Sequence, residues 1–315
     1  MDTYDVIIIG GGAAGLTASI YTRRKKLSTL VVSINMGGQT NLTEHIENYP
    51  GYLDLSGPKL MQLFDEQSKN FGTEFVFGKV AKLEKRGTGF TATLANGEAY
   101  KAKAVILAYG KVPRSLGIPG EEHFLGRGVS TCATCDMPLF NKKTVAIIGG
   151  GNSALEAAEL GSKFCAKVYL IHRRNEFRGD PVTVDKIKAA HNVEMVLNAV
   201  PVEVRGDKFV KAMVIEDVTT KEKRELPVNG VFVEIGYITQ TDFVKHLVEL
   251  NKSNEILINE QCETRTPGLF ACGDVTNVPY KQTIISAGQG AIAGLSAYNY
   301  LQKLEGKPTV KTDWA

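Results

Sequence analysis

Two glycine-rich segments, each preceded by a short apolar run, constrain the fold of this chain more than any other feature. The first follows Tyr4–Ile9 and begins at Gly10, and the second follows Thr144–Ile148 and begins at Gly149. In such a segment the first glycine allows a tight turn, the second admits a pyrophosphate, and the third small residue packs a helix on a strand. The apolar runs predict buried parallel strands, and their repetition predicts two βαβ units.

The residues after each glycine-rich segment predict the rest of each unit. The expected elements are a helix over 13–24 and a strand over 29–33, then a helix over 153–164 and a strand over 167–172. Two further apolar strands, 104–110 and 230–236, each end at a glycine and lead into a connector. We therefore predict an α/β fold with two Rossmann-like dinucleotide-binding domains, the second inserted into the first. The expected domains are 1–113 with 244–315, and 114–243.

Composition and charge exclude several classes of protein. The net charge of +3 does not indicate a nucleic-acid partner, and the basic run Arg23–Lys26 closes a predicted helix, where cations are favourable. No apolar stretch is long enough to span a membrane, and no targeting segment is recognisable. The five cysteines are odd in number and irregularly spaced, unlike a secreted disulfide framework. We expect a cytoplasmic protein that binds neither nucleic acid nor membrane.

The pair Cys132 and Cys135 is the strongest candidate for chemistry. Two neighbouring cysteines store two electrons as a disulfide, the same number that a dinucleotide transfers as hydride. Ser130 or Thr131 is expected to cap a helix whose N-terminus stabilises a thiolate. Asp136 follows at once, either as a first-turn carboxylate or as a proton donor to a dithiol or reduced flavin. Half of a zinc site and an inert pair are the alternatives, but the other cysteines are scattered, so no metal site is predicted.

The residues after the second strand of each unit indicate the ligand. In the first unit that position holds Ser33 and no carboxylate, so a ribose must be held otherwise, for example by the loop 37–40. In the second unit the strand ends at His172-Arg173-Arg174, with Arg178 close behind. Arginines accommodate a 2′-phosphate, so this cluster favours NADPH; a solvated basic surface is the alternative.

Near the C-terminus a strand ends at Gly273-Asp274 and leads to a helix expected over 282–301. Gly288, Gly290 and Gly294 in that helix allow close backbone approach. An aspartate at such a strand end can bind a ribityl hydroxyl, and the helix N-terminus can stabilise negative charge on a reduced isoalloxazine.

With these motifs assembled, the chain resembles the low-molecular-weight thioredoxin reductases over essentially its whole length. The motifs occur in that family's order, and Cys132-Ala133-Thr134-Cys135-Asp136 is identical to its active-site form. The resemblance assigns one set of residues to FAD: Gly10, Gly12, Ala14, Gly15, Gly37, Gly38, Gln39, Asn48, Gly110, Gly273, Asp274, Lys281, Gln282 and Thr283. It assigns a second set to NADPH: Gly149, Gly151, Asn152, Ser153, His172, Arg173, Arg174 and Arg178.

The resemblance also implies roles and partners. Cys135 would face the flavin and hold a charge-transfer thiolate, Cys132 would attack and release the substrate disulfide, and Asp136 would be the acid. Electrons would pass from NADPH through FAD and the cysteine pair to thioredoxin or a thioredoxin-like protein. A homodimer and a rotation of the inserted domain are implied as well. The chain departs from the family at Met137–Leu139 and at Lys281, where the family commonly has an arginine.

Three other functions are compatible with these motifs. A flavin dithiol oxidase would pass electrons from a small dithiol to oxygen, but it would not need the arginine cluster. A peroxiredoxin reductase usually carries an additional N-terminal dithiol domain, whereas here the first glycine-rich segment starts at Gly10. A non-catalytic nucleotide-binding redox sensor would not need every catalytic position that this chain keeps.

Overall fold

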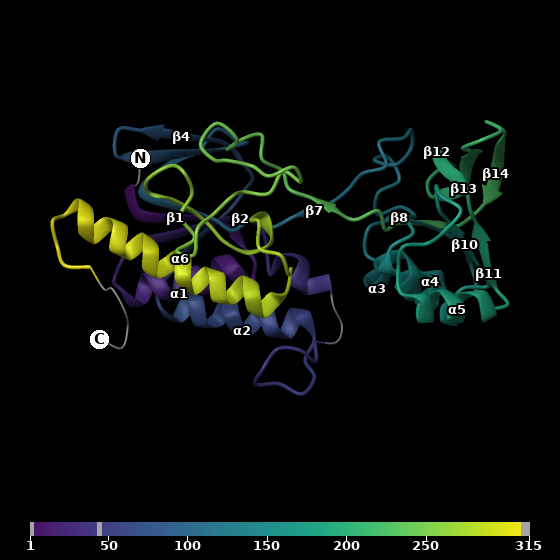
Figure 1. Ribbon diagram of the computed structural model, residues 1–315, viewed down its shortest axis with the longest axis horizontal. Coiled ribbons are helices and arrows are strands. Elements are labelled where there is room, and N and C mark those ends of the chain that lie inside the picture. The colour runs from purple at the N-terminus through teal and green to yellow at the C-terminus, as the bar shows by residue number, and fades with distance from the viewer. Residues whose placement is uncertain (1–2, 43–45, 310–315) are drawn as a thin grey trace. The chain divides into compact units, whose positions relative to one another are not determined.

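The computed structural model describes residues 3–42 and 46–309, which form two compact units (Figure 1). The first unit comprises the residues up to Val112 together with those from Ile238 onward. The second unit is the inserted segment Pro113–Tyr237. Within the described residues, no helix is both long and apolar enough to cross a membrane.

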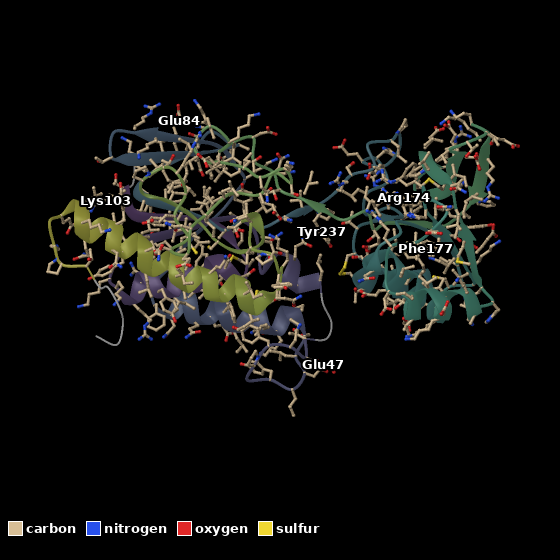
Figure 2. All side chains as sticks on the ribbon, viewed as in Figure 1. Glu47, Glu84, Lys103, Arg174, Phe177 and Tyr237 are labelled. Atoms are coloured by element: carbon tan, nitrogen blue, oxygen red, sulfur yellow. A yellow bond between two sulfur atoms is a disulfide. The ribbon has the colours of Figure 1, made fainter. Side chains whose placement is uncertain are left out.

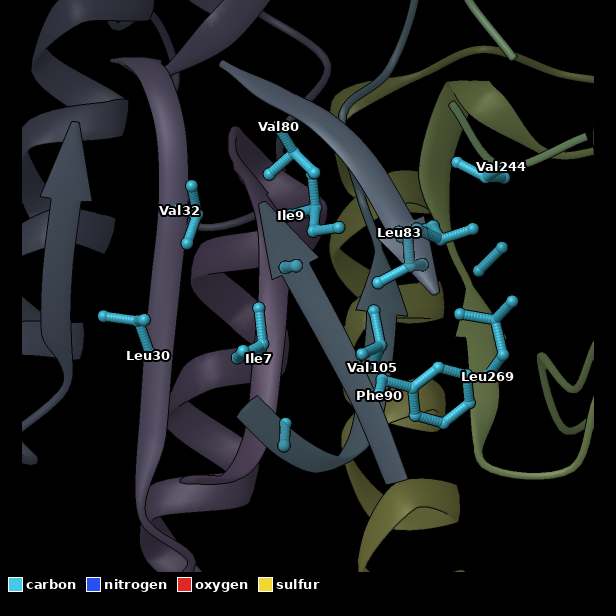
Figure 3. Close-up of a cluster of buried hydrophobic side chains, with 14 of the residues drawn as sticks. Ile7, Ile9, Leu30, Val32, Val80, Leu83, Phe90, Val105, Val244 and Leu269 are labelled. Carbon is cyan, nitrogen blue, oxygen red and sulfur yellow. The ribbon is translucent and has the colours of Figure 1, made fainter. Parts of the chain in front are cut away.

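A largely parallel sheet forms the centre of the first unit. Its strands, in spatial order, are β3 (Glu74–Phe77), β2 (Thr29–Met36), β1 (Thr3–Gly11), β6 (Ala99–Leu107), β5 (Gly89–Leu94) and β4 (Val80–Arg86). Strand β6 has two partners along one edge. Its first half pairs antiparallel with β5, and its second half pairs parallel with β17 (Leu269–Ala271). Apolar side chains from these strands make one buried core, in which Ile7, Val105 and Phe90 lie together (Figure 3).

Three α-helices lie among the described residues of the first unit: α1 (Ala13–Arg24), α2 (Gly57–Asn70) and α6 (Thr283–Leu304). Helices α1 and α6 lie side by side (Figure 1) because two glycines of α6 leave no side chain between them. A Cβ on Gly290 would lie 2.2 Å from the carbonyl oxygen of Ala14, and one on Gly294 would lie 2.9 Å from that of Ala18. The predicted close approach is therefore real at Gly290 and Gly294, whereas Gly288 meets nothing within 4 Å.

The second unit repeats the βαβ arrangement on a smaller scale. A parallel sheet has the order β11 (Val193–Val196), β10 (Lys167–Ile171), β9 (Thr144–Ile148), β15 (Gly230–Val233) and β8 (Val129–Ser130). Its helices are α3 (Ala133–Asp136), α4 (Asn152–Phe164) and α5 (Pro181–Ala189). An antiparallel sheet of β12 (Ala199–Gly206), β13 (Val210–Asp217) and β14 (Lys223–Pro227) completes it. The short strands β7 (Val112–Pro113) and β16 (Tyr237–Ile238) pair where the chain crosses between the units.

The α/β fold with two βαβ units, one inserted in the other, is as predicted. The return crossing, however, lies six residues before the predicted boundary, at Tyr237 and Ile238. Phe243 explains the difference, because its ring lies 5.2 Å from that of Tyr109 and packs against the core of the first unit. The polar stretch 239–242 that suggested a connector therefore already belongs to the first unit.

We expect Gly290→Ala to destabilise the protein and Gly288→Ala to leave it unharmed, although both place an alanine in α6. At Gly290 the new methyl group must displace the carbonyl of Ala14, at a cost of about 2 kcal/mol. At the exposed Gly288 the higher helix propensity of alanine stabilises by up to about 1 kcal/mol. Urea unfolding of the two variants measures the difference. Equal midpoints would show that the α1–α6 contact tolerates a side chain.

Candidate functional site

A cavity of about 680 Å³ opens within the first unit, between the start of α1, the carboxyl ends of the central strands and the start of α6. It collects nearly all the residues that the sequence associates with FAD. The residues of that set that line it are Gly10, Gly12, Ala14, Gly37, Gly38, Gln39, Asn48, Gly110, Gly273, Asp274, Lys281, Gln282 and Thr283. The exception is Gly15, which lies behind the loop: a Cβ there would sit 1.9 Å from the carbonyl oxygen of Gly10.

The loop from β1 to α1 presents bare backbone to this cavity. Gly10 has a φ of +118° and lies against the carbonyl oxygen of Ala108, so no side chain fits there. A Cβ on Gly12 would meet only one atom, 3.9 Å away, and one on Gly110 would meet none within 4 Å. Because both glycines line the cavity, a bound group can approach their backbone closely.

Ser33 occupies the strand-end position where a ribose-binding carboxylate is missing from the sequence. Its side chain holds the glycine-rich loop in place. Its hydroxyl accepts a hydrogen bond of 2.9 Å from the backbone N–H of Gly11 and donates one of 2.5 Å to the carbonyl of Asn35. The loop 37–40 predicted to replace the carboxylate does line the cavity.

Side-chain hydrogen bonds join this loop region to the start of α6. Asn48 donates to Gln282 over 3.2 Å, and the hydroxyls of Thr40 and Thr283 are 3.4 Å apart.

The segment after β17, at Gly273 and Asp274, is anchored to the same helix. There Ser286 donates to Asp274 over 3.2 Å, and Gln289 accepts from the backbone N–H of Gly273 over 2.7 Å. Ser286 and Gln289 escaped the sequence prediction because polar residues in a helix carry no motif of their own.

An ion-paired cluster stands at the cavity wall. The carboxylate of Glu255 lies 2.7 Å from Lys111 Nζ and 3.0 Å from Lys281 Nζ, and both lysines line the cavity. Burial raises the pKa of Glu255, but hydrogen bonds from Lys111, Asn251 and Lys281 outweigh it and bring the pKa down to about 2. Two positive charges against one negative charge leave this wall electropositive.

Tyr109 supplies an unpartnered hydroxyl at the same cavity. Its oxygen is buried and has no hydrogen-bond partner among the described residues, and burial raises the pKa of the phenol. An orphaned hydroxyl, open glycine backbone and a positive wall together fit an elongated ligand that carries phosphates and hydroxyls, as FAD does. The sequence could not identify Tyr109 as a residue of the site, because it lies at the end of a predicted apolar strand.

The second unit carries the other glycine-rich loop. A Cβ on Gly149 would lie 2.3 Å from the carbonyl oxygen of Glu234, and one on Gly150 would lie 2.2 Å from the ring of His172. Asn152 accepts a hydrogen bond of 2.8 Å from the backbone N–H of Asp180. Gly151 and Ser153 stand at the open start of α4, since a Cβ on Gly151 would meet nothing within 4 Å and Ser153 is exposed.

The predicted arginine cluster assembles around the buried His172. Burial lowers the pKa of this histidine, and the charges of Arg178, Arg174 and Arg173 lower it further. The histidine ring is stacked on that of Phe177 at 5.4 Å, and Figure 2 labels Phe177 and Arg174 on this unit. All three guanidinium groups belong to exposed residues, and no carboxylate of the described chain pairs with them. They are therefore available for a phosphate.

Cys132 and Cys135 form a disulfide with their Cα atoms 5.4 Å apart, drawn in yellow in Figure 2. The expected cap is wrong: Cys132 itself is the N-cap of α3, and its sulfur accepts the backbone N–H of Cys135 at 3.3 Å. Ser130 lies two residues earlier, and its hydroxyl accepts a hydrogen bond of 3.0 Å from the backbone N–H of Cys132. Asp136 is the last residue of this short helix and is partly exposed.

The segment Met137–Leu139 departs from the resembled family. One of its apolar side chains is buried and another is exposed. Met137 is fully buried and accepts a hydrogen bond from the thiol of Cys165 at 3.6 Å, while Leu139 is 68% exposed. Cys165, Cys262 and Cys272 are buried free thiols, as predicted. In the described part of the chain, no three histidine, cysteine or acidic side chains gather as a metal site.

We expect Glu255→Gln to lower the free energy of unfolding at pH 7 by about 2 kcal/mol, because it leaves Lys111 and Lys281 without a counter-charge. The Glu255 pKa is lowered in the folded chain, so its stabilisation is present above the unfolded value of about 4.3 and lost as the pH falls towards about 2. Urea unfolding at several pH values should therefore show the two proteins converging in acid. Glu249→Gln, at an exposed carboxylate nearby, is the control. A constant difference at all pH values would contradict the assignment.

Comparison with known proteins gives the family. Residues 4–294 match the family described as Pyridine nucleotide-disulphide oxidoreductase. The thioredoxin reductase of Lactococcus lactis shares the fold with a TM-score of 0.83 and 35% identity, over 95% of this chain and 99% of that one. For the T. acidophilum thioredoxin reductase the values are 0.80 and 33%, over 96% and 100%.

Curated relatives include a subunit of the alkyl hydroperoxide reductase of Pseudomonas putida, 40% identical over 95% of this chain. The same subunit of the Staphylococcus aureus enzyme is also 40% identical over 95% of the chain. The chain spans only 58% and 59% of the length of these two relatives. The predicted cofactors FAD and NADPH are those that this family and the thioredoxin reductases use. The chain belongs to the pyridine nucleotide-disulphide oxidoreductase family, and its fold is that of the low-molecular-weight thioredoxin reductases.

Proposed function

We propose that this chain is an NADPH-dependent flavoprotein that reduces the disulfide of thioredoxin or of a thioredoxin-like protein. In the net reaction, NADPH and one proton reduce a protein disulfide to two thiols and leave NADP⁺. The observation that carries the proposal is the Cys132–Cys135 disulfide, held in the inserted unit of a chain whose other unit has a cavity lined by a glycine-rich loop.

The residues predicted from the sequence receive the following roles. The cavity residues from Gly10 to Thr283 would hold FAD, the glycine-rich loop at Gly12 offering its open backbone to a phosphate group. The loop at Gly149 and the cluster of Arg173, Arg174 and Arg178 hold NADPH by its phosphates. Bound FAD would supply the two-electron chemistry that links NADPH to the disulfide.

The protein's own groups complete the dithiol chemistry. Cys135 receives the electron pair and holds the first thiolate, which its place in α3 stabilises. Cys132 is then free to attack the disulfide of the partner protein, forming a mixed disulfide that Cys135 resolves. Asp136, in the same helix, carries the proton that the leaving thiolate needs. We also propose a homodimer, as in the resembled family.

A peroxiredoxin-type partner is the second candidate, because the curated relatives named above are subunits of an alkyl hydroperoxide reductase. The exposed Leu139 beside the disulfide is part of the surface that a partner would meet, and it departs from the resembled family. A dithiol oxidase is less well supported, since it would leave the arginine cluster without a purpose.

The test is an anaerobic titration of the purified protein with NADPH, followed by flavin absorbance. We expect about two equivalents of NADPH per flavin in the unaltered protein, because flavin and disulfide each take one electron pair. Cys132→Ser or Cys135→Ser should bind FAD normally but take up about one equivalent and lose all disulfide reduction. Cys272→Ala removes a thiol outside the pair and is the control.

The same preparation distinguishes the partners. Thioredoxin disulfide, an oxidised peroxiredoxin, and oxygen with a small dithiol are supplied in turn, and turnover is compared. Faster turnover with the peroxiredoxin would replace the first proposal by the second. Bound flavin that NADPH does not bleach would exclude NADPH as donor and bring the dithiol oxidase forward.

The arginine cluster makes a separate prediction about the nicotinamide. Arg173→Ala and Arg174→Ala should each raise the KM for NADPH about tenfold and leave that for NADH unchanged, because each removes a charge-assisted bond to the 2′-phosphate. Arg205→Ala is the matched control, since that exposed guanidinium of the same unit is already paired with Glu203 and Glu225. Equal losses with both nucleotides would show that these arginines do not read the 2′-phosphate.

A further inference from the structure

Lys111 stands at the wall of the cavity in the first unit, at a position to which the sequence assigned no role. It directly follows Gly110, whose open backbone lines the same cavity. Its main chain is tied to the loop 37–40, because Gln39 donates a hydrogen bond to the carbonyl of Lys111 over 3.5 Å. The side chain is only 18% exposed. The tied backbone and the burial together keep the ammonium group at this wall.

Glu255 fixes the direction of the Lys111 side chain. One of its carboxylate oxygens lies 2.7 Å from Lys111 Nζ and 3.0 Å from Lys281 Nζ. The other oxygen accepts a hydrogen bond of 2.7 Å from the side-chain amide of Asn251. The backbone N–H of Glu255 donates to the Asn251 side chain over 3.0 Å. Because Asn251 holds both the main chain and the carboxylate of Glu255, this carboxylate keeps its place beside the lysines.

The two lysines differ in how many of their protons the protein uses. Lys281 also donates to the carbonyl of Thr276 over 2.6 Å, so two of its three N–H groups have partners within the chain. Within the described residues, the ammonium group of Lys111 donates to Glu255 alone. Two of its N–H groups are therefore available to a ligand. Since one carboxylate faces two ammonium groups, the cluster also keeps one positive charge without a counter-charge.

The order of the strands shows which part of a dinucleotide this charge would meet. Strands β2, β1 and β6 are neighbours in that order, and the residues at or just after their carboxyl ends bring Ser33, Gly12 and Lys111 to the cavity. In such a unit the pyrophosphate lies at the loop after the first strand, and the adenosine ribose lies at the end of the second. The remaining half of the ligand then lies at β6. In FAD that half carries the isoalloxazine ring.

We propose that Lys111 is a cofactor-binding residue whose ammonium group stabilises the negative charge that the isoalloxazine ring of FAD gains on reduction, and that Glu255 is the positioning residue that holds it there. This inference rests on the proposed function, in which FAD occupies the cavity. A hydride brings two electrons and one proton to the neutral ring, which becomes an anion. A fixed positive charge favours that anion over the neutral ring, so the reduction potential depends on the charge at position 111.

The experiment measures the reduction potential of the bound flavin by anaerobic equilibration with a dye of known potential. The full-length holoproteins all carry Cys132→Ser and Cys135→Ser, so that no disulfide takes up electrons. We expect Lys111→Met to lower the ratio of reduced to oxidised flavin about tenfold at a fixed dye ratio, which is about 30 mV for a two-electron couple. The affinity of the apoprotein for oxidised FAD should not change, because the oxidised ring is neutral.

Two further variants separate charge from structure. Lys111→Arg keeps the charge and should restore the potential. Glu255→Gln removes the charge that offsets the lysines, while its amide oxygen still accepts a hydrogen bond from Lys111, so it should raise the potential. A structural defect alone would not give opposite signs in Lys111→Met and Glu255→Gln. Lys82→Met is the matched control, since Lys82 is paired with Glu84 at 2.9 Å in the same unit and is not among the residues that line the cavity (Figure 2 labels Glu84).

Equal potentials in Lys111→Met and Lys111→Arg overturn the proposal. Weaker binding of oxidised FAD with an unchanged potential also overturns it, because the ammonium group would then serve the pyrophosphate. If Lys111→Met does not fold, a potential that Glu255→Gln lowers or leaves unchanged overturns the proposal instead.

The dye equilibration requires neither NADPH nor a partner protein, so its failure is separate from that of the proposed function. Shifted potentials together with a failed NADPH titration would refute the reductase function alone. A normal titration together with unshifted potentials would refute the role of Lys111 alone. A chain that binds no FAD would refute both.

Discussion

The close contact between backbone atoms around Ala14 is the interaction on which the first unit depends. A Cβ on Gly290 would fall 2.2 Å from the carbonyl oxygen of Ala14, and one on Gly15 would fall 1.9 Å from that of Gly10. These missing side chains let α1, its loop and α6 meet without a gap. Both helices consequently begin at the same cavity, where their unsatisfied N–H groups favour an anionic ligand.

The second unit uses the same device with different chemistry around it. A Cβ on Gly10 would lie 2.3 Å from the carbonyl oxygen of Ala108, and one on Gly149 would lie 2.3 Å from that of Glu234. The units differ after their second strands. In the first unit the hydroxyl of Ser33 is hydrogen-bonded to the loop itself. Groups from distant segments must therefore recognise the ligand. In the second, the ring of His172 lies against Gly150, and the positive charges of the three arginines that follow it in the chain act on this histidine.

How far the sequence could predict this protein depends on the range of the interactions. Local patterns predicted the bounds of α1 correctly. They also predicted residues for FAD of which nearly all line one cavity, because glycine loops and apolar strands are short-range signals. Contacts between distant residues left no such signal. Lys111 and Glu255 are 144 residues apart, and nothing near either one indicates the pairing. The cap of α3 was mistaken because hydroxyl residues are commoner caps than a cysteine sulfur.

Glu234 fixes the glycine-rich loop of the second unit through its main chain. Its carbonyl oxygen lies against Gly149, at the turn where the nucleotide phosphates are proposed to bind. The corresponding position of the first unit is Ala108, whose carbonyl oxygen makes the same contact with Gly10. The side chains at these two positions differ in size and charge, so the duplicated fold depends on the backbone contact and not on the side chain.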